Sequence, residues 1–242
     1  EHKLTRWVIA GASTLTLISV LMSYSRGAFV ALAAMALYWM FTRRQVKSIA
    51  ATVIIGGLAF TLLPDQWFDR METIGDYSED RSAHGRLDAW RTSFNMAKAD
   101  PFTGAGFTAI ERPDVYFAHN PDSILGASKA AHSIYFQVLG DHGFVGLFVY
   151  LSIALLAWRN TQRLSLSPPG TQRDDWIIDI TLALKLSLIG FWVGGACLSM
   201  AYYDTYFILV VVSGISTQIH TGSTHKNDAS FMRNLVPSRS AK

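Results

Sequence analysis

Six apolar stretches constrain the fold of this chain more than any other feature of its sequence. The only charged side chains well inside one of them are Asp179 and Lys185, near one end of the fifth. A helix of roughly 20 apolar residues crosses a bilayer, and flanking Tyr, Trp, Ser and Thr extend shorter runs into the interface. The pattern therefore predicts an all-α polytopic membrane protein with about six transmembrane helices. The stretches cover residues 7–23, 27–42, 48–63, 143–158, 177–201 and 206–220.

Composition excludes several other classes of protein. Half of the 242 residues are hydrophobic and 16% are charged, so this is not a polar disordered chain. The single cysteine, Cys197, excludes a disulfide scaffold and a cysteine-based zinc site. A net charge of +3 indicates no nucleic-acid partner. Because the chain begins at Glu1 and its first apolar run lacks a signal-peptide cleavage site, we expect it to be part of a longer protein.

The placement of charge predicts an orientation in the membrane. Four segments outside the apolar runs hold twelve of the 21 lysines and arginines and only four acids, whereas the long loop 64–142 holds seven basic and twelve acidic residues. Basic residues gather on the cytoplasmic side, so the loop is expected on the opposite side. The basic segments are residues 1–6, 43–47, 159–176 and 221–242. The expected organisation is three transmembrane helices (1–63), the external loop (64–142), three more helices (143–220) and a flexible cytoplasmic tail (221–242).

The external loop is expected to be helical. Residues 64–74 have the spacing of an amphipathic helix on the membrane surface. Residues 82–99 predict a second helix that ends before Pro101, with a buried stripe of Leu87, Trp90, Phe94 and Ala97.

A third helix is expected over residues 129–139, followed by a break at Gly140 and Gly143. Its helical spacing would place His132, Tyr135, Phe136 and Leu139 on one face.

Several kinds of site are missing from the sequence. There is no phosphate-binding Gly-rich loop ending in Gly-Lys-Ser/Thr, no His-Glu-x-x-His pair, no Gly-x-Ser-x-Gly elbow and no Asp-x-Asp pair. Gly104-Ala105-Gly106 is interpreted as a turn, and no two histidines have the spacing of a metal site. The sequence therefore predicts no metal site.

Three residues remain as candidates at the external membrane face: Arg26, Arg86 and His132. Each also has a purely structural interpretation. Arg26 could anchor a helix end by snorkelling, Arg86 could be a surface arginine paired with Asp88, and His132 could serve packing alone.

Four segments around these residues resemble the O-antigen ligase and polymerase superfamily. Three are Ser25-Arg26-Gly27 before an apolar helix and Arg43-Arg44, Gly85-Arg86-Leu87-Asp88-Ala89-Trp90, and Asp100-Pro101-Phe102-Thr103-Gly104-Ala105-Gly106. In the strongest match, His132-Ser133, nine residues, Gly143, two residues and Gly146 have the spacing of the ligase signature His-Asn/Ser/Gln-x9-Gly-x-x-Gly/Thr/Tyr. The resemblance covers about residues 13–160, and residues 118–146 look like the exosortase-associated O-glycosylation ligases.

The resemblance implies a fold, a place and a reaction. The chain would be the C-terminal part of a larger glycosyltransferase-C-like protein in a bacterial inner membrane, with its loop in the periplasm. It would move a glycan from undecaprenyl pyrophosphate to a hydroxyl of a lipid or protein acceptor. Arg26 and Arg86 would bind the pyrophosphate without a metal or other cofactor. His132 would be the general base, or would only orient the donor, and Ser133, Gly143 and Gly146 complete the signature.

Three alternatives stay open. A polymerase of the same superfamily would use a second lipid-linked repeat unit as acceptor, and a protein O-oligosaccharyltransferase would use a protein. A transporter or scaffold belongs to another class, and the scarcity of charged residues inside the apolar runs disfavours it.

Overall fold

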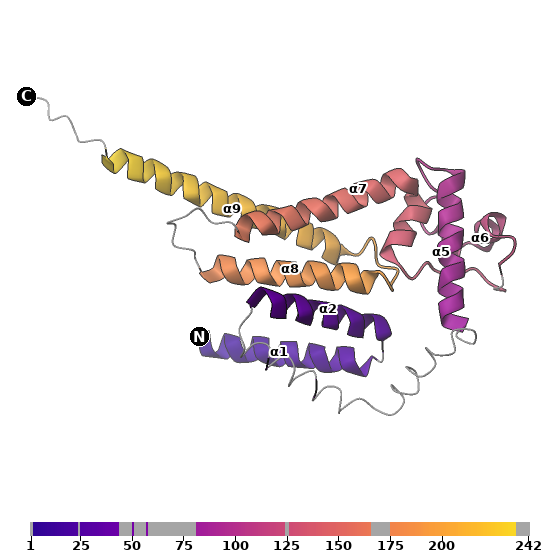
Figure 1. Cartoon of the computed structure of the whole chain (residues 1–242), viewed down its shortest axis with the longest axis horizontal. Coiled ribbons are helices and arrows are strands. Elements are labelled where there is room, and N and C mark those ends of the chain that lie inside the picture. Colours follow the sequence, from indigo (N-terminus) through magenta and orange to yellow (C-terminus); the bar gives the residue numbers. More distant parts are fainter. Residues whose placement is uncertain are drawn as a thin grey trace, which may run out of the picture. The chain divides into compact units, whose positions relative to one another are not determined.

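The computed structural model describes residues 2–23, 25–43, 81–123, 126–165 and 175–235, together with positions 50 and 57. All regular structure in this part of the chain is helical. Five of the six apolar runs fall in helices, while the run 48–63, apart from those two positions, and the amphipathic segment 64–74 lie outside the described residues. The five helices are α1 (His2–Met22), α2 (Arg26–Arg43), α7 (Ile134–Ser165), α8 (Asp175–Gly195) and α9 (Asp204–Leu235) (Figure 1).

Two of these helices are long and apolar enough to cross a membrane: α7, and α8 over Trp176–Gly195. A shorter apolar helix, Gly27–Thr42, lies within α2. The ends of two helices differ from the ends of the apolar runs. α8 stops at Gly195 and is followed by a turn, while α9 continues to Leu235.

The chain forms two compact units. The first comprises Glu1–Phe148 and Ile189–Ala201, and the second comprises Val149–Leu188 and Tyr202–Lys242. The first unit therefore holds α1, α2, the helices within residues 81–119, the beginning of α7 and the end of α8.

A buried lysine joins two helices of the second unit. Lys185 of α8 donates hydrogen bonds through Nζ to Ser165 Oγ at 2.6 Å and to Gln162 Oε1 at 3.3 Å, both on α7. A buried ammonium needs such polar partners, so the one basic residue inside the fifth apolar run holds α8 to α7. A cluster of Leu164, Ile177 and Leu184 surrounds this junction with apolar contacts.

In the first unit, small residues let α2 and the end of α8 approach closely. Gly190 faces Met35, Gly194 faces Ala31, and Gly27 faces Cys197, where an added Cβ would stand 2.9 Å from the Cys197 Cβ. The partners run in opposite directions along the two helices, so the packing is antiparallel. Glycine and alanine at four-residue spacing are typical of close helix packing in membranes.

Between α2 and α7 the structure describes α5 (Arg81–Ala99), a short 3-10 helix η1 (Ala109–Glu111) and α6 (Pro113–His119). The prediction of a helix ending before Pro101 is confirmed. The predicted buried stripe is wrong at Leu87 and Phe94, which are 44% and 45% exposed, whereas Ala97 is buried and Trp90 is partly buried. The buried side carries small residues, which allow close contact with α6 and with Gly140 of α7. That side consists of Ala89, Thr92, Ser93, Met96 and Ala97.

A turn after α5 docks on a bend in α7. Gly143 has φ 67° and ψ −167°, which breaks the helix there, and the change of direction is visible in Figure 1. The Phe144 N–H donates to the Pro101 carbonyl at 2.9 Å, and the Ala105 and Gly106 N–H groups donate to the carbonyls before the bend. Gly104-Ala105-Gly106 is thus a turn, as interpreted from the sequence. Gly140, also expected to break the helix, remains helical and contacts Ser93.

We expect Gly143→Ala to destabilise the protein by about 1–3 kcal/mol, because a Cβ would overlap the Pro101 carbonyl and the positive φ would be strained. The thermal unfolding midpoint of the full-length protein in detergent measures this. Gly126→Ala is the matched control, since no heavy atom lies within 4 Å of its Cβ position. An unchanged midpoint in Gly143→Ala would mean that α7 does not depend on the bend.

Candidate functional site

His132 lies in the loop before α7, not in a helix. The helix expected over residues 129–139 in fact begins at Ile134, so His132 does not share a helix face with Tyr135 and Phe136. Its backbone has φ 46°, a left-handed conformation that is uncommon for a residue with a side chain. Such a conformation persists only where its surroundings hold it, and it is frequent at functional sites.

Two hydrogen bonds hold the peptide group that joins Ala131 to His132. The Trp90 indole N–H donates to the Ala131 carbonyl at 2.7 Å, and the Trp90 ring stacks on Phe136 with centroids 4.8 Å apart. The His132 N–H donates to Ser199 Oγ at 2.8 Å. The loop is therefore tied to α5 through Trp90 and to the turn after α8 through Ser199.

Arg86 lies one turn before Trp90 on α5, and its charge acts on His132. Partial desolvation by neighbouring atoms lowers the pKa of His132 below its usual 6.5, and the cations of Arg86 and Lys129 lower it further, while Glu111 opposes them. The imidazole is exposed and mainly neutral at neutral pH, so it can accept a proton. Within the described part of the chain, the Arg86 guanidinium makes no hydrogen bond or ion pair.

Asp88 is not the partner of Arg86. Its carboxylate accepts hydrogen bonds from Tyr116 Oη at 2.8 Å, Asn120 Nδ2 at 2.9 Å and Ser123 Oγ at 2.5 Å. Residues two apart on a helix do not face each other, so Asp88 points to α6 while Arg86 does not. Burial raises the pKa of Tyr116 to about 12, and the Asp88 carboxylate adds to this. Asp88 thus fastens α6 to α5.

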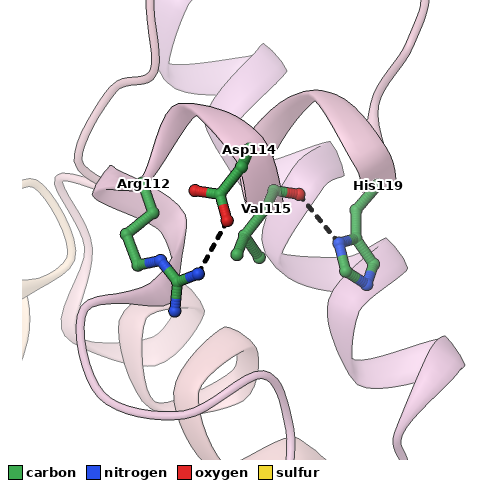
Figure 2. Close-up of polar contacts among 4 residues, drawn as sticks. All are labelled: Arg112, Asp114, Val115 and His119. Carbon is green, nitrogen blue, oxygen red and sulfur yellow. Dashed lines mark hydrogen bonds and ion pairs between the residues drawn. The ribbon is translucent and has the colours of Figure 1, made fainter.

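Two local contacts lie near the ends of α6 (Figure 2). Arg112 and Asp114 form an exposed ion pair at 2.6 Å, and the hydrogen bond from Arg112 lowers the pKa of the Asp114 carboxyl. His119 donates through Nδ1 to the Val115 carbonyl at 2.9 Å, one turn earlier on the same helix. These contacts stabilise the two ends of α6.

Arg26 is the first residue of α2, and its side chain lies outside the described part of the structure. The residues beside it explain the Ser-Arg-Gly sequence. Ser25 caps the helix, because its Oγ accepts the Ala28 N–H at 3.3 Å, and Gly27 permits contact with Cys197. Cys197 and Ser199 belong to the same turn, so this turn contacts both the start of α2 and the loop of His132.

The remaining signature residues shape the beginning of α7. Ser133 is buried, and its carbonyl accepts the Gln137 N–H at 2.8 Å. Gly143 makes the bend, and a Cβ on Gly146 would overlap the His142 side chain. These residues shape the backbone that follows His132. Among the described residues, no group of three or more His, Cys, Asp and Glu side chains could hold a metal.

The sequence did not reveal two residues that contact the site. Trp90 was expected in the core, and its spacing on α5 could not show that its N–H reaches Ala131. Ser199 lies 67 residues from His132 in a turn that was expected to be helix, and no local pattern identifies it. Lys129 and Glu111 act on His132 through charge, and exposed charges in a loop carry no distinguishing sequence signal.

The described residues define a helical protein with membrane-length apolar helices and an exposed histidine held beside an arginine where one such helix begins. Comparison with protein families matches residues 11–151 to the family described as O-antigen ligase, which covers more than half of the chain. The chain therefore belongs to the O-antigen ligase family, a family of membrane proteins. Comparisons with curated proteins and with solved structures gave no match.

We expect Asp88→Ala to lower the free energy of unfolding by about 1–3 kcal/mol for each buried donor left without its acceptor. The donors are on Tyr116 and Asn120, which are both buried. The thermal unfolding midpoint checks the prediction. Asp114→Ala is the control and should leave the midpoint almost unchanged, because the ion pair of Figure 2 is exposed. Equal effects of the two substitutions would contradict the role of Asp88.

Proposed function

We propose that this protein is a membrane glycosyltransferase that transfers a glycan from undecaprenyl pyrophosphate to an acceptor hydroxyl on the periplasmic side of a bacterial inner membrane. Family membership supports a glycosyltransferase of the ligase and polymerase class. The observation that carries the finer proposal is the exposed, neutral imidazole of His132 within the electrostatic reach of Arg86. A base and a phosphate-binding cation next to each other are what this transfer requires.

The reaction forms one bond and breaks another at the first sugar. The acceptor oxygen bonds to the anomeric carbon while His132 takes the hydroxyl proton. The bond from that carbon to the phosphate oxygen breaks, and its electron pair leaves with undecaprenyl pyrophosphate. Arg86 stabilises the charge that builds on the leaving phosphate, because a guanidinium stays protonated and can hold two phosphate oxygens at once.

Arg26 is proposed as the second cation. It stands at the N-terminus of α2, where backbone N–H groups point out of the helix and favour an anion. The turn that contacts Gly27 through Cys197 also holds His132 through Ser199, which supports a shared site. With two guanidinium groups on the pyrophosphate, we expect transfer without a metal ion.

Donor binding should strengthen the base. Arg86 and Lys129 lower the pKa of His132 in the free protein. A bound pyrophosphate would neutralise much of the Arg86 charge and so raise that pKa. His132 is then neutral before the donor arrives and a better proton acceptor afterwards.

The topology of this proposal has six transmembrane helices. Residues 1–63 and 143–220 each contribute three, residues 64–142 form the periplasmic loop, and residues 221–242 lie in the cytoplasm. The distribution of lysine and arginine supports this orientation.

Transfer by the full-length protein in liposomes tests the function directly. We expect His132→Ala to lower transfer by about 100- to 10,000-fold, because general-base catalysis has that size. Arg86→Ala and Arg26→Ala should each lower it by about 100- to 1,000-fold, the effect of losing one group that stabilises the charge of the transition state. The substrate is a lipid-linked single repeat unit with a separate hydroxyl acceptor, and product is measured by mass.

Two controls accompany this measurement. Omitting the separate acceptor should abolish product, whereas chain growth without it would identify a polymerase. Chelation of divalent metals should leave transfer intact, and a strict need for metal would contradict binding of the pyrophosphate by arginines alone. Wild-type transfer in His132→Ala would exclude the general-base role.

The pH dependence of transfer tests the charges around His132. Transfer should fall as pH drops through the pKa of His132, because the protonated imidazole cannot accept a proton. Lys129→Gln removes a cation and should raise the pKa of His132. The acidic limb of the profile of transfer against pH should then move to higher pH. Glu111→Gln removes an anion and should move the limb to lower pH. Lys98→Gln, at the exposed end of α5, should not move it.

Opposite shifts in the first two variants are the expected signature. If neither variant moves the acidic limb, the group that titrates in the reaction is not His132.

A further inference from the structure

Two phenylalanines on the turn after α5 are exposed. Phe102 is 79% exposed and Phe107 is 67% exposed, although both are large apolar side chains. No charged residue occurs from residue 101 to residue 110. A turn on a water-facing surface normally carries polar residues, so this one is unusual for a loop in water.

The backbone of this turn is fixed to α7. Its Ala105 N–H donates to the Gly140 carbonyl at 2.9 Å, and its Gly106 N–H donates to the Asp141 carbonyl at 3.0 Å. The Phe107 ring contacts the His142 ring edge to face, with centroids 4.5 Å apart. These contacts fix the turn that carries the two phenylalanines beside the bend of α7.

The apolar surface continues onto α7 and α5. Phe144 and Phe148, the first aromatic residues after the bend, are 42% and 72% exposed. Phe94 of α5 meets Phe144 edge to face, with centroids 6.1 Å apart. We call the set of Phe94, Phe102, Phe107, Phe144 and Phe148 the aromatic rim.

We propose that the aromatic rim inserts into the lipid bilayer, with Phe102 and Phe107 immersed beside the end of α7 that carries the bend. α7 is apolar and long enough to span a membrane, so the lipid that surrounds it after Gly143 also meets the rim. Burial of these rings in lipid removes apolar surface from water, which favours insertion.

Insertion of the aromatic rim would set the depth of Arg86 and His132 relative to the membrane surface. The turn is bonded to α7 nine residues after His132, and α5 carries both Phe94 and Arg86. Anchoring the rim in lipid therefore holds Arg86 and His132 close to the membrane surface, where lipid phosphates lie. The proposal depends on α7 as a membrane helix and not on the transfer reaction.

Site-specific fluorescence quenching tests the insertion. In a cysteine-free full-length protein, with Cys197→Ser, we would introduce Phe102→Cys or Phe107→Cys and attach a nitrobenzoxadiazole label. The protein is placed in phosphatidylethanolamine and phosphatidylglycerol liposomes. Spin-labelled lipid should quench most of the fluorescence at both positions, and aqueous iodide should quench little. Asp122→Cys, at an exposed polar position of the same loop, should show the reverse.

Either of two results would overturn the proposal. Iodide quenching at positions 102 and 107 equal to that at 122 would place the rim in water. Protection from both quenchers would mean that protein covers the rim. Thermal unfolding confirms that each labelled variant is folded, and Phe102→Cys alone decides the question if the loss of the contact between Phe107 and His142 unfolds the other variant.

Discussion

The bend of α7 at Gly143 is the constraint on which the packing of α5 and the loop of His132 depends. The backbone there adopts a conformation open to glycine, and the turn around Gly104 approaches so closely that a side chain on either glycine would collide with backbone atoms of the other segment. Backbone hydrogen bonds between the turn and α7 stabilise the contact. The end of α5 is thereby attached to the start of α7, and the loop of His132 lies between them.

Short-range interactions around His132 define the chemistry of the site. Trp90 and Ser199 hold the peptide group before His132. Partial desolvation, and then the charges of Arg86 and Lys129, lower the pKa of its imidazole. Residues 64–142 carry more acidic than basic residues, yet two cations, Arg86 and Lys129, and one acid, Glu111, act on this one histidine. The site is therefore locally basic within an acidic segment, as an anionic pyrophosphate donor would require.

The sequence predicted well wherever one segment decides its own structure. Proline after Asp100 ended α5 as expected, and Gly104-Ala105-Gly106 formed the expected turn. The predicted stripe on α5 failed at two of its four positions because large apolar residues were assumed to face inward. In a chain beside a membrane, small residues such as Ala89 and Ser93 pack against neighbouring helices, while Leu87 and Phe94 remain exposed.

By itself the sequence determined the helical class, the positions of the apolar helices and the signature from His132 to Gly146, because hydrophobic runs and glycine spacing are local properties. Only the tertiary structure decided what surrounds His132. Trp90 lies 41 residues from Ala131, and Ser199 lies 67 residues from His132. Hydrogen bonds and charges act through space, so the start of α7 and the partners of His132 in the loop before it depend on how the helices pack.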